Sequence, residues 1–151
     1  AKIACPDVPV VGFSGDGAFG IAVTELTAIW RKEWPAITMI VFRNYQWGAE
    51  KRNSTLWYDD NFVGTELDDD VSYAGIAKAC GLQGVQAFTM DELTKALAQA
   101  IEDQMKHGKT TLIEAMINQE LGEPFRRDAM KKPVKVAGID RADMRPQRGA
   151  A

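Results

Sequence analysis

Short apolar runs alternate with segments of helical spacing along this chain, and this alternation constrains its fold more than any other feature. Residues 8–14 and 36–43 are almost continuously apolar, as are strands buried on both faces of a parallel sheet. Two further β-rich runs cover residues 84–88 and 110–118. We therefore predict an α/β fold, a doubly wound and mainly parallel sheet with helices on both faces.

Helical spacing and end signals predict three helices between these runs. Residues 18–32 carry apolar side chains at helical spacing, and Trp34-Pro35 ends that helix. A second helix is expected over residues 70–80. The third opens at a capping-box pattern over residues 89–92 and ends at Gly108.

Residues 44–70 are predicted to form a long irregular segment. A loop of that length in a compact domain is usually functional or disordered. This one holds several Trp and Tyr residues, which argues against disorder. Its two acidic clusters, residues 59–61 and 68–70, fit no calcium loop, so we expect solvated charges and a helix cap.

Composition bounds the domain organisation. The chain has 151 residues, of which 46% are apolar, enough for one core. Its net charge of −3 gives no reason to propose nucleic acid as a partner, but the charge is uneven. Residues 1–119 carry −6 and residues 120–151 carry +3. We expect residues 1–119 to form the folded domain and residues 120–151 an extended basic arm.

The small number of cysteines and the lack of a long apolar stretch bear on the cellular location. The cysteines, Cys5 and Cys80, are too few for a disulfide scaffold, so we expect reduced thiols and a cytoplasmic protein. No apolar stretch approaches the ~20 residues that span a bilayer, and no signal-peptide pattern is present. The chain starts without Met and soon enters a strand, so we expect it to be part of a longer polypeptide.

A carboxylate between two glycines follows the first strand, in Ser-Gly-Asp-Gly-Ala-Phe-Gly over residues 14–20. Asp16 lies just past the first strand and Asn44 just past the second, where ligands bind in parallel sheets. Glycines allow close approach of the backbone, and the helix beginning near Ala18 offers N–H groups suited to phosphate. Hard oxygen ligands of this kind suit Mg²⁺ bound to a diphosphate. The competing interpretations are a helix N-cap for Asp16 and a turn residue for Asn44.

The spacing of this motif resembles a known family. Gly15-Asp16-Gly17, a spacer of 26 residues and Asn44 resemble the thiamine-diphosphate motif of the acetolactate synthase and pyruvate decarboxylase superfamily. By that resemblance Asp16 and Asn44 bind Mg²⁺ through their side chains and Gln46 binds it through its carbonyl. The cofactor-binding residues so implied are Ser14, Gly15, Asp16, Gly17, Ala18, Phe19, Asn44, Tyr45, Trp47 and Gly48. Many relatives have Asn where this chain has Arg43.

Two longer stretches, residues 43–67 and 118–139, resemble the sulfoacetaldehyde acetyltransferase family within that superfamily. The resemblance implies a C-terminal diphosphate-binding domain that uses thiamine diphosphate and Mg²⁺. The implied reaction takes sulfoacetaldehyde and phosphate to acetyl phosphate and sulfite. It also implies a homo-oligomer and a pyrimidine-binding domain, absent from this chain, that supplies the activating glutamate. The alternatives are another thiamine-dependent carboligase or decarboxylase, such as acetolactate synthase, and a cofactor-binding or assembly module without catalysis of its own.

For several residues outside the metal-binding motif, the sequence allows both a functional and a structural role. Glu50 is a candidate catalytic proton carrier, by resemblance to some decarboxylases, or it forms an ordinary ion pair with a local cation. Tyr45, Trp47 and Gly48 line the thiazolium pocket or serve aromatic packing. His107 is expected to be exposed and not catalytic. The cations available for the anionic groups of the substrates are Arg43, Lys51, Arg52, Arg126 and Arg127, although we expect an interface or tail contact for the last two.

Overall fold

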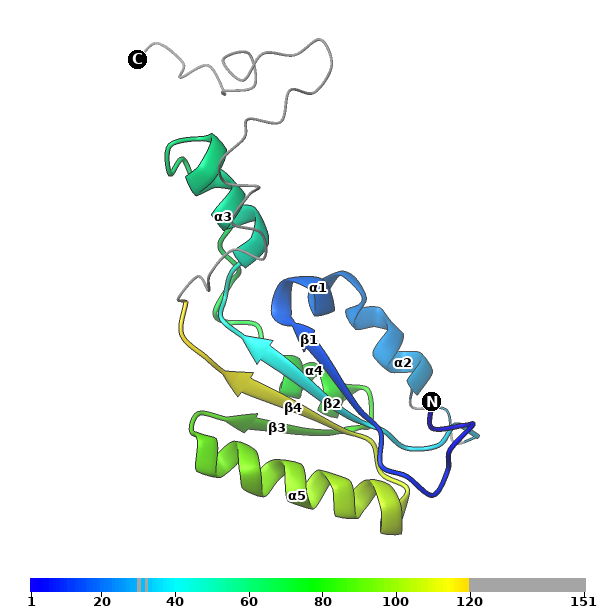
Figure 1. Ribbon diagram of the computed structural model, residues 1–151. Helices are drawn as coiled ribbons and strands as arrows, with labels where there is room; N and C mark the ends of the chain where they lie inside the picture. Colours follow the sequence, from blue (N-terminus) through cyan, green and yellow to red (C-terminus); the bar gives the residue numbers. More distant parts are fainter. Residues whose placement is uncertain (30, 32, 120–151) are drawn as a thin grey trace. The chain divides into compact units, whose positions relative to one another are not determined.

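The computed structural model describes residues 1–29, 31 and 33–119 (Figure 1). These residues belong to two compact units, which we treat separately. The first comprises residues 1–46 and 67–119 and contains the sheet, and the described part of the second comprises residues 47–66. Within the described ranges we find no helix whose length and apolar character would let it cross a membrane. The arm predicted over residues 120–151 lies outside the described residues.

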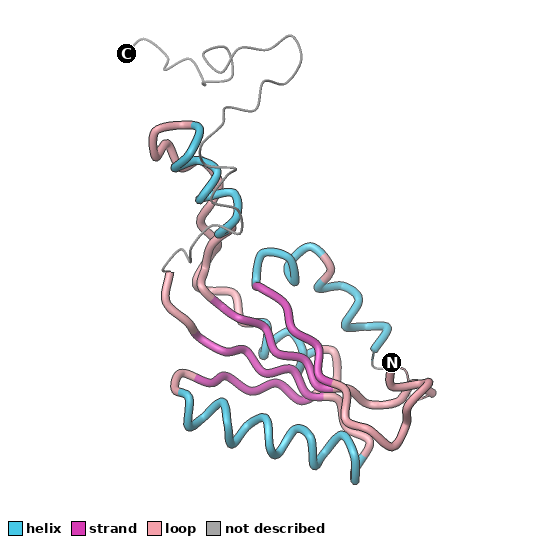
Figure 2. The backbone as a smooth tube through the Cα atoms, in the orientation of Figure 1, coloured by secondary structure: helices cyan, strands magenta, loops and turns pink. Residues whose placement is uncertain are grey.

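A four-stranded parallel sheet, whose strands are magenta in Figure 2, forms the centre of the first unit. Its strand order is β1-β2-β4-β3 (Figure 1). Its strands are β1 (Val11–Gly15), β2 (Thr38–Arg43), β3 (Gln83–Ala87) and β4 (Thr111–Met116). Strands β1 and β2 are neighbours, and Gly15 pairs with Phe42 in their register. The residues that follow these two strands therefore leave the sheet at the same edge.

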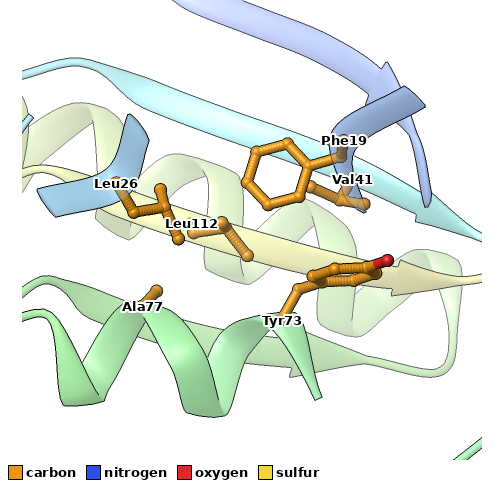
Figure 3. Packing of buried hydrophobic residues seen from close by; sticks show 6 residues of the cluster. All are labelled: Phe19, Leu26, Val41, Tyr73, Ala77 and Leu112. Carbon is orange, nitrogen blue, oxygen red and sulfur yellow. The ribbon is translucent and has the colours of Figure 1, made fainter. Parts of the chain in front are cut away.

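Both faces of the sheet are covered, as predicted. Ile40 and Val41 are consecutive on β2 and point to opposite faces. On one face Val41 and Leu112 pack with side chains from α1 (Asp16–Ile21), α2 (Leu26–Ile29) and α4 (Tyr73–Ala79) (Figure 3). On the other face Ile40 belongs to the cluster on which α5 (Met90–His107) packs. The remaining buried members are Phe19, Leu26, Tyr73 and Ala77 on the first face and Ala87, Ala100, Ile113 and Ala115 on the second.

Helix α5 (Met90–His107) confirms the prediction made from its end signals. The Thr89 side chain accepts a hydrogen bond from the Glu92 N–H, and the Glu92 carboxylate accepts one from the Thr89 N–H. Gly108 ends the helix in the left-handed conformation, with φ of 61°. His107 is exposed, as expected.

The continuous helix predicted over residues 18–32 is wrong. The chain forms α1 (Asp16–Ile21), a 3₁₀ turn η1 (Val23–Glu25) and α2 (Leu26–Ile29). Glycine and β-branched residues, which are poor helix formers, lie in and between these pieces. Gly20 allows close packing here, because a Cβ at this position would lie 2.8 Å from the Tyr73 hydroxyl oxygen and the tyrosine would have to shift.

Two further boundaries differ from expectation. Helix α4 (Tyr73–Ala79) begins after its N-cap residue Ser72 and not at residue 70. Helix α3 (Gly48–Trp57), in the second unit, occupies part of the segment predicted to be irregular. The good helix formers over residues 49–52 are followed by polar residues of weaker helix preference, and the helix has no clear apolar face, so periodicity gave no signal there.

Candidate functional site at the carboxyl ends of β1 and β2

Asp16 is the first residue of α1 and follows β1 directly. Its side chain is buried, and its Oδ2 accepts hydrogen bonds from the main-chain N–H groups of Asn44 at 3.1 Å and Tyr45 at 2.7 Å. Its Oδ1 accepts the N–H of Gly17 at 2.9 Å. Gly15 is the N-cap of α1, and no side chain caps this helix. The interpretation of Asp16 as a helix cap is therefore wrong, and its carboxylate is held across two strand ends instead.

The chain turns sharply after β2, at Tyr45. This residue has a φ of 59°, in the left-handed region that few side chains adopt. The turn presents the N–H groups of Asn44 and Tyr45 to the Asp16 carboxylate. It is fixed further by Leu67, whose N–H donates to the Tyr45 carbonyl, and by Met116, whose sulfur accepts from the Tyr45 hydroxyl.

The side-chain amide of Asn44 lies beside this turn, 3.2 Å from Oδ1 of Asp16 and 3.2 Å from the main-chain oxygen of Gln46. Hydrogen bonding assigns the amide nitrogen to the side that faces these two acceptors, and the amide oxygen then accepts from Nε2 of Gln46. A rotation of the amide by 180° would instead place its oxygen beside the other two oxygens, which is the arrangement that a cation favours.

The chemistry of this donor set fits Mg²⁺. Adjacent ligands of an octahedral Mg²⁺, at about 2.1 Å from the ion, lie about 3.0 Å apart. The separations of 3.2 Å are close to that spacing. One carboxylate, one amide and one carbonyl oxygen would leave the remaining positions to phosphate oxygens and water.

A buried arginine lies behind the carboxylate. Arg43, at the end of β2, is 1% exposed, and its Nη1 lies 3.4 Å from Oδ2 of Asp16. Its Nε lies 3.5 Å from Oε1 of Glu114, which is completely buried on β4. Its guanidinium carbon lies 4.3 Å from the ring centre of Tyr45 and 5.0 Å from that of Tyr73.

Tyr73 joins this group from α4. Its hydroxyl donates to the main-chain oxygen of Asp16 at 3.1 Å. Burial raises the pKa of Tyr73 above its ordinary value of 10.0, while the charge of Arg43 acts in the opposite direction. The sequence analysis missed both Tyr73 and Glu114. A glutamate in an otherwise apolar strand was the available signal, because a buried charge requires a partner.

The predicted diphosphate-lining residues lie at the same edge of the sheet. The Ser14 hydroxyl donates to the Gly15 carbonyl at 3.1 Å. Gly15 is exposed, and open space adjoins it, since a Cβ there would meet nothing within 4 Å. Ala18 is exposed, whereas the Phe19 side chain packs edge-on against Tyr73 in the core (Figure 3). Phe19 can therefore meet a ligand only through its main chain.

The remaining candidates belong to the second unit or lie outside the described residues. Trp47 precedes α3 and Gly48 begins it, and Glu50 is exposed in its first turn. Lys51 pairs with Glu66, not with Glu50. The cofactor and substrate contacts expected of this segment stay predictions. Arg52 also lies on α3, and Arg126 and Arg127 lie outside the described ranges.

Residues 1–115 match the family described as "Thiamine pyrophosphate enzyme, C-terminal TPP binding domain". The chain belongs to this family. Thiamine pyrophosphate is another name for thiamine diphosphate, so the family supplies the diphosphate for which the Asp16 edge was predicted. The superfamily resemblance read from Gly15-Asp16-Gly17 and Asn44 is confirmed.

Within this family, the chain is similar in sequence to the following curated enzymes. The chain is 84% identical to a sulfoacetaldehyde acetyltransferase of Roseovarius nubinhibens and 82% identical to one of Rhodobacter capsulatus, over 97% of its length in each case. It is 30% identical to the acetolactate synthase isozyme 2 large subunit of Escherichia coli over 64% of its length. The chain spans about a quarter of the length of the two acetyltransferases, 24% and 25%.

A solved structure supports the fold. The benzoylformate decarboxylase of Polynucleobacter necessarius superposes with a TM-score of 0.70 at 24% identity, over 82% of this chain and 22% of that one. This thiamine pyrophosphate-binding domain therefore has the predicted doubly wound α/β architecture. Its four parallel strands bring Asp16 and Asn44 together as the motif requires.

Proposed function

We propose that this chain is the C-terminal cofactor-binding domain of a thiamine-diphosphate- and Mg²⁺-dependent sulfoacetaldehyde acetyltransferase. The reaction implied by the family resemblance converts sulfoacetaldehyde and phosphate to acetyl phosphate and sulfite. One structural observation carries the cofactor part: the buried carboxylate of Asp16 is held by the main chain of Asn44 and Tyr45, so that the strand-end carboxylate and the strand-end amide lie together. The substrate part is supported by identities of 84% and 82% to two enzymes of that name.

The residues at the edge of the sheet would hold the metal and the diphosphate. Asp16 and Asn44 would bind Mg²⁺ through their side chains, and Gln46 would bind it through its main chain. The main chain over residues 14–19 would lie along the diphosphate, and open space beside Gly15 supports this. When bound, the cofactor would supply the nucleophilic carbon of the reaction, and these residues would hold its diphosphate and metal in place.

The acid–base and electrostatic roles would fall to residues 45–52. Glu50 would carry protons between the reacting carbon and solvent, a role that suits its exposed position in the first turn of α3. Tyr45, Trp47 and Gly48 would line the thiazolium side. The sulfonate and the phosphate are anions, so Lys51 or Arg52 would offset their charge. Arg43 is already committed to buried acceptors.

Activity would require further protein. A pyrimidine-binding domain, from the same or a partner chain, would supply the glutamate that activates the cofactor, and we expect a homo-oligomer. The chain's share of its relatives, 24% and 25%, supports this need for additional domains.

Acetolactate synthase chemistry is the second candidate, favoured by the 30% identity to the Escherichia coli subunit. The metal-binding motif does not distinguish the two activities, because the whole superfamily shares it. Analysis of the reaction products distinguishes them. The full-length protein that carries this sequence should release sulfite and acetyl phosphate from sulfoacetaldehyde and phosphate. Acetolactate formation from pyruvate, without sulfite release, would replace the proposed substrate while retaining the cofactor.

The same assay should include Asn44→Ala, with Gln99→Ala as a control on the exposed surface of α5. Loss of product in the Asn44 variant alone would connect the activity to the proposed metal site. Full activity in Asn44→Ala would contradict the assignment of the amide oxygen as a ligand.

A further inference from the structure

Arg43 poses an electrostatic question. A guanidinium that lies 3.4 Å from the carboxylate of a metal ligand should oppose cation binding by charge repulsion. The carboxylate of Glu114 offsets most of this repulsion, because its Oε1 lies 3.5 Å from Nε of Arg43. The pair is close to neutral as a whole, so its effect on a cation is one of position more than of charge.

Glu114 is itself fixed in place. Its Oε2 accepts hydrogen bonds from the Ser72 hydroxyl at 3.0 Å, the Ala74 N–H at 3.1 Å and Nε2 of Gln86 at 3.1 Å. Its Oε1 and Nε of Arg43 are buried and have no hydrogen-bond partner within the described part of the chain. Their interaction is therefore one of charge.

Arg43 has little freedom to move. Nη2 donates to the main-chain oxygens of Asp68 at 2.5 Å and Val71 at 3.1 Å. The rings of Tyr45 and Tyr73 flank the guanidinium. An arginine held on all sides in this way presents Nη1 to Oδ2 of Asp16 at a fixed position.

The two carboxylate oxygens of Asp16 consequently have different surroundings. Oδ2 faces three donors, the N–H groups of Asn44 and Tyr45 and Nη1 of Arg43. Oδ1 accepts one N–H and faces the amide of Asn44. Only Oδ1 is directed toward the other oxygens of the proposed site.

We propose that Arg43, anchored by Glu114, is a positioning residue: together with the N–H groups of Asn44 and Tyr45 it restricts Asp16 to one metal-binding oxygen, and it so strengthens the preference of the site for Mg²⁺ over Ca²⁺. The proposal rests on the metal site of the proposed function. Mg²⁺ requires compact octahedral geometry, whereas the larger Ca²⁺ takes six to eight oxygens and readily accepts both oxygens of one carboxylate. Loss of the Arg43 contact would leave Oδ2 with two N–H donors in place of three donors, which would make the two-oxygen contact easier and improve Ca²⁺ binding relative to Mg²⁺.

Separate titrations of Mg²⁺ and Ca²⁺ into the full-length protein, at fixed thiamine diphosphate, test this. Tryptophan fluorescence or calorimetry would report binding without any turnover, and the measured quantity is the ratio of the two dissociation constants. The main variant is Arg43→Gln/Glu114→Gln, which removes both buried charges together. Arg43→Lys keeps the buried positive charge but lacks the planar guanidinium with its fixed donors. It is the second test variant if the double variant does not fold. Glu102→Gln/Lys106→Gln removes an exposed pair on α5 as the matched control.

The preference for Mg²⁺ should fall about tenfold in the double variant, the scale at which residues around metal ligands act. It should fall less in Arg43→Lys and stay unchanged in the control. A wild-type ratio in the folded Arg43 variants would overturn the proposal, as would equal weakening for both cations, since that is what a merely structural role produces. If the wild type binds no cofactor with either cation, or Asp16→Ala binds normally, the proposed function itself fails.

Discussion

Helix α5 and the turn that follows β2 differ in how well their residues suit the local structure. Helix α5 has a reciprocal cap at Thr89, a left-handed glycine at its end and an exposed pair between Glu102 and Lys106. The turn after β2 has a buried arginine, a buried aspartate beside it and a tyrosine with φ of 59°. Local preferences agree throughout the helix and are violated repeatedly in the turn. Violations gathered at one place indicate a functional site, where something other than stability decides the residues.

The two ion pairs show the same contrast in electrostatic terms. Glu102 and Lys106 are separated by one helical turn at the surface, where water and salt screen the charges. Arg43 and Glu114 lie in the interior, where each charge needs the other to offset its loss of hydration. Removing one partner should therefore have very different consequences at the two places.

The largest effect is expected from Arg43→Gln alone. It leaves Glu114 charged and buried without its partner, so the free energy of unfolding should fall by about 3–5 kcal/mol. The double variant Arg43→Gln/Glu114→Gln should recover part of that loss, because no unpaired charge remains. Denaturant unfolding of the full-length protein would measure both. A single variant as stable as the wild type would remove the contrast between the two pairs.

A smaller effect is expected from Thr89→Ala, which deletes the side-chain half of the α5 capping box. The loss of one capping hydrogen bond should cost about 1 kcal/mol of stability. Because α5 is a structural element in this account, Mg²⁺-dependent cofactor binding should not change. Weakened cofactor binding in this variant, at a temperature where it is fully folded, would show that the helix and the site are not independent.

The smallest effect is expected from Glu102→Gln. The hydrogen bond and charge of Lys106 hold the pKa of Glu102 below its ordinary value of 4.5. The pair's contribution is therefore present above pH 4.5 and is lost as the pH falls through the lowered pKa of the folded protein. Near neutral pH the thermal midpoint of the variant should lie slightly below that of the wild type, and the two should converge at low pH. Below pH 4.5 the wild type should lose slightly more stability than the variant, and the opposite trend would contradict the sign.

The sequence predicted the sheet and α5 because these elements follow period and end signals. The apolar runs around Ile40 and Ile113 had the continuity of strands covered on both faces, and both proved to be central strands. The pattern of Thr89, Glu92 and Gly108 marked both ends of α5. Helices α1 and α3 were missed or misjudged, because glycine spacing and polar composition gave no clear apolar face.

For the candidate site, the sequence predicted the residues with a spacing motif and missed those defined by tertiary contact. Asp16 and Asn44 were identified from their positions after neighbouring strands, and the structure brings them together. Glu114 reaches the site through Arg43, and Tyr73 reaches it from another helix. No spacing rule connects such positions. Arg43 was considered as a substrate contact, and its surroundings instead direct it to buried acceptors.

The most direct test of the central claim is a calorimetric titration of thiamine diphosphate into the full-length protein, with and without Mg²⁺, for the wild type and Asp16→Asn. This substitution preserves the shape of the side chain while removing its charge, and Asp91→Asn on the exposed first turn of α5 is the matched control. The account predicts Mg²⁺-dependent binding in the wild type and the control, and none in Asp16→Asn at concentrations that saturate the wild type. Wild-type binding by Asp16→Asn, with unchanged dependence on Mg²⁺, would contradict the claim that Asp16 holds the metal.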